Sequence, residues 1–309
     1  MPRWWNKRRR RRRPCKSRAM RLPRWSVFSN YTTTIRRHKA GDASCFMKRG
    51  KQMKKTLLCC IIASTFTTLV HGAEKVIIYG DDDYAPYSYV ENGQFKGIYV
   101  DVLKNAIQKL PAGYQVELRP IPWKRGLDLL ESGAGFALFP PYMKKERTYI
   151  QSYSVPLLRE EVALFCHEDA MKSVRKKFPE DFSGITIGIN AGFALTDTLG
   201  AAAKSGKVNL SEAKGNESNL KKLASKRVDC YANDKGSILY SAKKLRADPQ
   251  FGNFKLIEAA MLSGESAHIG YSVNFKAAYK TDFIEKMNAA LNEVKKGDAI
   301  NTAVEAYIK

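Results

Sequence analysis

From residue 74 onward, short apolar runs alternate with stretches in which apolar residues recur every three or four positions. Short runs of this kind predict strands, and the three-to-four spacing predicts amphipathic helices. In the first part of this region we expect strands at 76–79, 115–119, 135–139 and 162–166, and helices at 98–110 and 123–130. The alternation of strand and helix favours an α/β fold in which helices cover parallel strands.

The alternation restarts near residue 185 and continues to the C-terminus. There we expect strands at 185–189, 208–211, 228–232, 254–258 and 268–273, and helices at 194–203, 219–225, 236–245 and within 283–308. Two units of about 100 residues each predict two α/β lobes. Open α/β sheets bind ligands beyond the carboxyl ends of their strands, so we expect a site in the loops that follow the strands.

Charge is distributed unevenly along the chain. Residues 1–73 contain 20 Lys and Arg against a single acidic residue, whereas residues 74–309 contain 33 against 29. The net charge of +23 therefore belongs mostly to the N-terminal segment. Binding of nucleic acid needs clustered cations facing the phosphates, so the balanced remainder of the chain is not expected to bind nucleic acid.

A signal-peptide pattern begins at Met53, where two lysines, a short apolar stretch and small residues follow one another up to Ala73. About 14 apolar-leaning residues are too few for a membrane span, which needs about 20. We expect a signal peptide at 53–73, with an uncleaved anchor or a buried helix as alternatives. Because a signal peptide acts at the N-terminus, we interpret residues 1–52 as a disordered upstream extension from a mis-assigned start codon. If this arginine-rich segment is translated, it is suited to nucleic acid or an anionic membrane.

Cysteine and histidine positions limit the chemistry of the exported chain. It retains Cys166 and Cys230, which in an oxidising compartment can form one disulfide or remain two buried thiols. Its two histidines, His167 and His268, lie far apart in the sequence, and no Cys/His cluster has metal-ligand spacing. We therefore expect no metal site and no cofactor.

Four residues in or near the loops after strands have side chains suited to a small polar ligand. Tyr84 and Trp123 offer aromatic faces, and Arg147 offers a guanidinium that grips a carboxylate through two parallel hydrogen bonds. Asp234 ends a strand just before a helix. Each residue also has a purely structural interpretation. The aromatic residues can pack between lobes, Arg147 can lie on the surface, and Asp234 can be a helix N-cap.

Five short motifs follow one another over residues 74–309. They are Tyr84–Tyr87, Gly97–Val102, Glu146–Arg147 with Ser152–Pro156, Ile185–Gly188 leading to Gly192, and Arg227–Asp229 leading to Asp234. Each motif alone is weak. As an ordered set they resemble the polar amino-acid-binding family of ABC-transporter proteins, the bacterial extracellular solute-binding proteins, family 3.

The resemblance implies a two-lobed periplasmic-binding-protein-like fold of type II, with two crossover strands and a ligand cleft between the lobes. Lobe one would comprise 74–163 and 268–309, and lobe two 164–267. The resemblance also assigns roles to the candidate residues. Arg147 would hold the α-carboxylate of an amino acid and Asp234 its α-ammonium, Tyr84 would stack on its side chain, and Trp123 and Gly192 would line the pocket.

The function implied by the resemblance is binding of a small polar solute, most simply an amino acid, by a monomeric periplasmic protein that is not an enzyme. The bound solute would pass to an inner-membrane ABC permease. Two alternatives use the same fold: a sensor that acts on a receptor, and a dehydratase of small carboxylic acids with Glu146 or Asp82 as acid or base. Pro140, Pro141 and Phe193 stand where the family usually offers hydroxyl residues, which makes the expected pocket unusually apolar and leaves the ligand open.

Overall fold

The computed structural model describes residues 72–308. The expected upstream extension at 1–52 lies outside the described residues, and so does the expected signal peptide apart from its last two residues. No helix in the described range is both long and apolar enough to cross a membrane.

The first lobe is built on a five-stranded sheet with the order β5-β1-β6-β13-β7. Its strands are β1 (Glu74–Asp81), β5 (Tyr114–Ile121), β6 (Ala137–Phe139), β7 (Ile150–Tyr153) and β13 (Gly270–Ser272). β5, β1 and β6 run parallel, whereas β13 is antiparallel to both β6 and β7. The central strand β6 is buried along its whole length, because it has a neighbour on each side and helices above and below.

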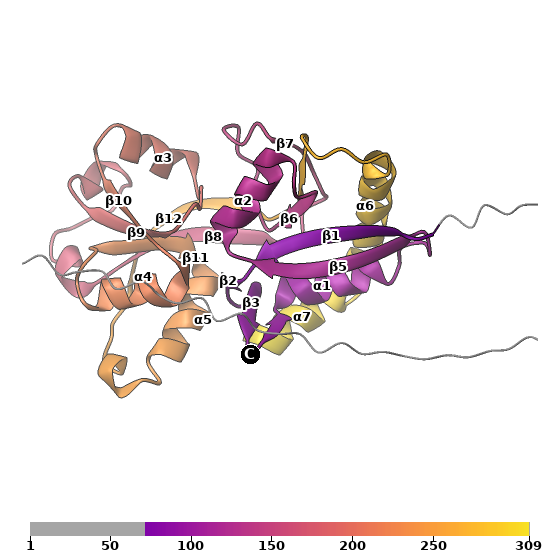
Figure 1. Cartoon of the computed structure of the whole chain (residues 1–309). Helices are drawn as coiled ribbons and strands as arrows, with labels where there is room; N and C mark the ends of the chain where they lie inside the picture. Colours follow the sequence, from indigo (N-terminus) through magenta and orange to yellow (C-terminus); the bar gives the residue numbers. More distant parts are fainter. Residues whose placement is uncertain (1–71, 309) are drawn as a thin grey trace, which may run out of the picture. The chain divides into compact units, whose positions relative to one another are not determined.

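Helices from both ends of the described chain cover this sheet. They are α1 (Ile98–Ile107), α2 (Trp123–Ser132), α6 (Lys280–Lys296) and α7 (Ala299–Ile308). α1 packs against α6 and α7, which groups the three on one side of β1 and β5 (Figure 1). A small antiparallel sheet of β2 (Asp83–Tyr84), β3 (Ser88–Glu91) and β4 (Gln94–Lys96) leads into α1.

The second lobe is built on another five-stranded sheet, with the order β10-β9-β11-β8-β12. Its strands are β8 (Arg159–Cys166), β9 (Thr186–Asn190), β10 (Asn209–Ala213), β11 (Cys230–Asp234) and β12 (Ile257–Ser266). Its helices are α3 (Asp197–Lys204), α4 (Gly215–Ala224) and α5 (Lys235–Leu245), with short 3-10 turns at Glu168–Met171, Glu180–Phe182 and Pro249–Phe251. Cys166 on β8 lies directly opposite Cys230 on β11, and the two form a disulfide.

Two segments connect the lobes and lie side by side. The chain leaves the first sheet after Tyr153 and returns to it at Gly270. The segments pair through backbone hydrogen bonds, among them one of 2.9 Å from the Ser154 N–H to the Ile269 carbonyl. The lobes are thus joined by two paired crossover segments, and the first lobe contains both ends of the described chain.

Two expectations from the sequence need correction here. The lobe boundary placed after residue 163 falls inside β8, which belongs wholly to the second sheet because its first half also pairs with β12. The strand expected at 254–258 instead runs over Ile257–Ser266. Two register shifts interrupt the pairing of β12 with β8, and such irregularities break the alternation of apolar and polar positions by which a strand is recognised.

Candidate functional site

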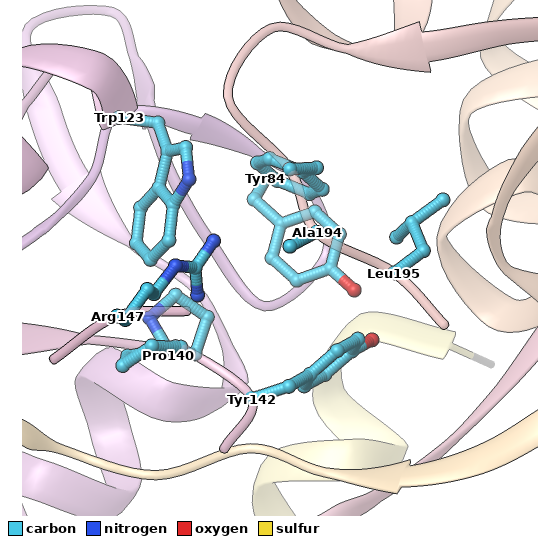
Figure 2. Close-up of a pocket in the computed structure, with 9 residues that line it drawn as sticks. Tyr84, Trp123, Pro140, Tyr142, Arg147, Ala194 and Leu195 are labelled. Carbon is cyan, nitrogen blue, oxygen red and sulfur yellow. The ribbon is translucent and has the colours of Figure 1, made fainter. Parts of the chain in front are cut away.

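A small cavity lies where the loops of the two lobes meet (Figure 2). The first lobe and the second lobe both contribute lining residues, which are Tyr84, Trp123, Pro140, Pro141, Tyr142, Arg147, Phe193, Ala194 and Leu195. The lining loops follow β6 and β9, two of the strands whose carboxyl ends were expected to mark the site. The cavity has a volume of about 20 Å³, which is room for about one water molecule.

Trp123 reaches the cavity because it is the first residue of α2. Pro122 precedes the helix, and Gly133 ends it in the left-handed conformation at φ 75°. Glycine is favoured at the end of a helix in this conformation, since it lacks a Cβ. The Trp123 indole N–H donates to the Gly192 carbonyl of the other lobe at 3.1 Å. Trp123 therefore helps to hold the two lobes together while its ring forms one wall of the cavity.

Among the described residues, Arg147 is the only charged one that lines this cavity. Its side chain is buried, with 6% of the residue exposed, and its guanidinium lies 5.6 Å from the centre of the Trp123 ring (Figure 2). One Nη donates to the Gly192 carbonyl at 3.3 Å, and within the described residues no carboxylate forms an ion pair with it. Burial lowers the pKa of Arg147 below its ordinary value. A buried cation with one weak acceptor leaves most of its five N–H donors free for an anion.

Gly192 lies beside the cavity and forms part of the contact between the lobes. Its φ of +81° is in the left-handed region, and a Cβ at this position would lie 2.8 Å from the Lys124 Cγ. Glycine is therefore required both by the backbone conformation and by the close approach of α2. Its carbonyl accepts hydrogen bonds from Trp123 and Arg147, so in this structure Gly192 orients two site residues and does not line the cavity itself.

Phe193 explains why the cavity is so small. Its ring packs edge-on against Tyr84 at 5.4 Å and against Trp123 at 5.6 Å, measured between ring centres. The two aromatic residues expected to contact a ligand thus contact a side chain of the opposite lobe instead. A ligand larger than a water molecule needs the lobes to part and the Phe193 ring to move.

Asp234 does not line the cavity. It is 2% exposed and caps α5, where its Oδ1 accepts from the Ser237 N–H at 2.7 Å and from the Tyr87 hydroxyl at 2.8 Å. Its Oδ2 accepts from the Glu161 N–H at 3.2 Å. In this structure Asp234 is therefore not placed to bind a ligand's α-ammonium group, which is the role that the resemblance implied. An Asp that ends a strand just before a helix can accept a hydrogen bond from the first N–H groups of that helix, and Asp234 does so here.

Glu160, which lies behind the cavity on β8, was not predicted from the sequence as part of the site. This residue is 1% exposed, and its carboxyl group accepts hydrogen bonds from the hydroxyls of Tyr84, Tyr99 and Tyr142, the last at 2.5 Å. Burial, with the nearby charge of Asp234, raises the pKa of Glu160 to about 8. The three hydroxyls belong to the first lobe and the carboxyl group to the second. An acidic residue just before an apolar strand was the available signal, but its three partners are distant in sequence.

The acidic run Asp81–Asp83 is less exposed than a solvated loop. Burial raises the pKa of Asp81 to about 8, and Asp82 forms an ion pair with Lys214 of the second lobe at 3.1 Å. Asp81 and Asp83 line a separate hollow of about 180 Å³ on the other side of Trp123. No group of three or more potential metal ligands is found within the described residues.

The fold resembles several solved structures. An ancestral arginine-binding protein bound to arginine has a TM-score of 0.61 and 22% identity, over 77% of this chain and 100% of that one. A histidine kinase sensor domain with similarity to periplasmic binding proteins has a TM-score of 0.63 and 17% identity, over 77% of this chain and 97% of that one. An ancestral amino acid-binding protein, a precursor of cyclohexadienyl dehydratase, has a TM-score of 0.59 and 20% identity, over 76% of this chain and 95% of that one. At these identities the similarity shows the two-lobed fold alone.

A search of curated proteins found no match to this chain. The family comparison is more specific than the structural one, because residues 76–309 match the model described as bacterial extracellular solute-binding proteins, family 3. This match extends over both lobes and over every cavity-lining residue. The chain belongs to the bacterial extracellular solute-binding proteins, family 3.

Proposed function

We propose that this protein binds a small carboxylate-bearing solute, in the range of amino acids and related acids, in the periplasm and delivers it to an inner-membrane ABC permease. The observation that supports this proposal is Arg147, a buried guanidinium in the inter-lobe cavity with no carboxylate partner in the described residues. Burying an unpaired charge is costly, and a planar guanidinium matches a carboxylate better than any other common anion except phosphate.

Binding by lobe closure follows from where the site residues come from. Arg147 and Trp123 belong to the first lobe, whereas Phe193 and Gly192 belong to the second. A ligand that contacts both sets stabilises the closed arrangement by its greater affinity for that arrangement. Hinge closure around a ligand is the motion typical of periplasmic binding proteins. The closed surface would then be the one that a permease recognises, and a monomer suffices for this role.

The lining of the cavity favours binding over catalysis. A dehydratase needs a general acid or base within reach of its substrate, and none of the nine lining residues is Asp, Glu or His. Asp82, one of the two residues considered for that role, forms an ion pair with Lys214, and neither it nor Glu146 lines the cavity. Glu160 lies behind Tyr84 and Tyr142, out of direct contact with the cavity.

The proposal is tested with Arg147→Met, which keeps an unbranched apolar stem but removes the charged guanidinium. Calorimetric titration with a panel of carboxylate solutes should give saturable binding to the wild-type protein and a loss of about 30-fold or more in Arg147→Met, because truncating one partner of a buried charge pair costs about 2–5 kcal/mol. Arg125→Met is the matched control, since Arg125 is exposed on α2 and does not line the cavity. Equal affinity in both variants would reject the proposal.

The unfolding temperature of each variant without ligand shows whether a loss of binding comes from a loss of the fold. Without ligand, Arg147→Met should unfold at the same temperature as the wild-type protein or at a higher one, because the substitution removes a buried charge that lacks a partner. Arg147→Lys should retain the cation but lose the planar fork, and should therefore bind the same solutes with intermediate affinity.

A further inference from the structure

The residues that line the cavity include one cationic side chain and no anionic one. Arg147 contributes a cation, and the other eight lining residues are aromatic, aliphatic or proline. A zwitterionic amino acid has two poles, and a site for it needs an anion as well as a cation. The cavity supplies a partner for the carboxylate pole only.

Neither of the two buried carboxyl groups near the cavity lines it. Asp234 accepts two hydrogen bonds at Oδ1 and one at Oδ2, and it lies outside the cavity. The carboxyl group of Glu160 accepts from three tyrosine hydroxyls, two of which stand between it and the cavity. Burial also raises the pKa of Glu160 to about 8, which weakens its negative charge at neutral pH.

The acidic residues of the second hollow do not change this balance. Asp81 and Asp83 line the second hollow, which shares Trp123 and Phe193 with the cavity. Burial raises the pKa of Asp81 to about 8, which weakens its negative charge at neutral pH. The hollow also contains Lys124 and Lys214, so it offers no excess of negative charge to an ammonium.

Main-chain donors are also few. Two consecutive prolines line the cavity, and proline has no N–H. Tyr84 and Tyr142 direct their hydroxyls away from Arg147, as Figure 2 shows. The space next to the guanidinium is therefore walled by the apolar faces of Trp123, Pro140 and Tyr142, which suit a hydrocarbon body.

We propose that this site prefers monocarboxylates with an apolar or aromatic body and no α-ammonium group over the corresponding amino acids. This inference rests on the proposed function, because it assumes that Arg147 receives a carboxylate. The reason is electrostatic. The carboxylate would pair with the buried cation of Arg147, whereas an α-ammonium group would be buried without an anionic partner, which is unfavourable.

The test uses matched pairs of ligands that differ only in the α-ammonium group. They are propanoate and alanine, 4-methylpentanoate and leucine, and 3-phenylpropanoate and phenylalanine. In calorimetric titrations of the full-length exported protein at pH 7, the acid should bind more tightly than its amino-acid partner by about ten-fold or more, since an uncompensated buried ammonium is unfavourable. The same titrations with Arg147→Met should abolish binding of the acids.

The possible outcomes separate this inference from the proposed function. If the amino acids bind as tightly as the acids or more tightly, and lose binding in Arg147→Met, the inference is overturned while carboxylate binding stands. If neither member of any pair binds, both the inference and the proposed function are overturned. If the acids bind but Arg147→Met binds them equally well, the cavity is not the site and the inference is overturned as well.

Discussion

Two buried ionisable groups differ in their surroundings: Arg147 lines the inter-lobe cavity, and Glu160 lies behind it. Glu160 has three hydroxyl donors, and its pKa is raised by burial and by the neighbouring charge of Asp234. Within residues 72–308, Arg147 has one carbonyl acceptor at 3.3 Å and no carboxylate partner. The hydrogen bonds of Glu160 are complete within the protein, whereas those of Arg147 are not. A buried group that the fold satisfies indicates a structural role, and a buried charge that the fold leaves unsatisfied indicates a ligand.

The same contrast separates the two residues that were expected to hold an amino acid. Asp234 and Arg147 are both buried, and the resemblance named both as ligand-binding residues. In the structure Asp234 accepts hydrogen bonds from the Ser237 N–H at the start of α5, from the Tyr87 hydroxyl and from the Glu161 N–H. Burial alone therefore does not identify a binding residue; the remaining hydrogen-bonding capacity does.

The largest expected effect is on stability, from removal of the structural member of the pair. Glu160→Ala should lower the free energy of unfolding by about 3–5 kcal/mol, because three buried tyrosine hydroxyls lose their acceptor. Glu160→Gln keeps a neutral acceptor oxygen and should cost less than half as much. Urea denaturation of both variants measures the difference. Equal losses in the two variants would show that the hydroxyls do not depend on this carboxyl group.

A smaller effect is expected on the pH dependence of stability. The pKa of Glu160 is about 8 in the folded protein and 4.5 as an ordinary glutamate, so between these values the folded state binds a proton that the unfolded chain does not. Its contribution is complete below pH 4.5 and is lost as pH rises through about 8, with a slope of at most about 1.4 kcal/mol per pH unit. Asp81, with a pKa also about 8, adds a slope of the same sign.

Glu160→Gln isolates the share of this slope that belongs to Glu160. The variant should lose stability less steeply between pH 5 and pH 8 than the wild-type protein, with the remaining slope due mainly to Asp81. Thermal unfolding at several pH values provides the comparison. Parallel pH profiles for the two proteins would contradict the assignment of a raised pKa to Glu160.

The smallest expected effect comes from one of the three hydroxyls. Tyr99→Phe should cost about 1 kcal/mol of stability and leave ligand affinity unchanged, because Tyr99 donates to Glu160 but does not line the cavity. Tyr142→Phe is the matched variant, since Tyr142 makes the same kind of hydrogen bond and also lines the cavity. Titration of both should show unchanged affinity, because the Tyr142 hydroxyl points away from Arg147 (Figure 2) and Tyr142→Phe keeps the ring that lines the cavity. A loss of affinity in either variant would mean that the Glu160 cluster takes part in binding.

Much of the fold was predictable because it depends on local patterns. The alternation of apolar runs and amphipathic stretches located β1, β6, β9 and β11 and most helices, and the ordered motifs indicated the family. The strand β12 was misplaced because its register shifts disturb the alternation. The pairing of Cys166 with Cys230 stayed open because it depends on the register of β8 with β11, which only the folded sheet defines.

The site was predictable only in part, for a similar reason. Arg147, Trp123 and Tyr84 were indicated by residue type and by their places after strands, and the structure brings all three to one cavity. The role of Glu160 was not predictable, because Tyr99 and Tyr84 lie 61 and 76 residues away in the sequence. The packing of Phe193 against Tyr84 and Trp123 was not predictable either, because it depends on how closely the two lobes approach each other.

The central claim is that the Arg147 guanidinium is left unpaired by the fold in order to receive a carboxylate. A crystal structure of the protein with its tightest-binding acid tests this claim most directly. We predict that both carboxylate oxygens lie within hydrogen-bond distance of the guanidinium and that the Phe193 ring has moved away from Tyr84 and Trp123. A carboxylate bound elsewhere, with Arg147 still donating only to the Gly192 carbonyl, would contradict the account.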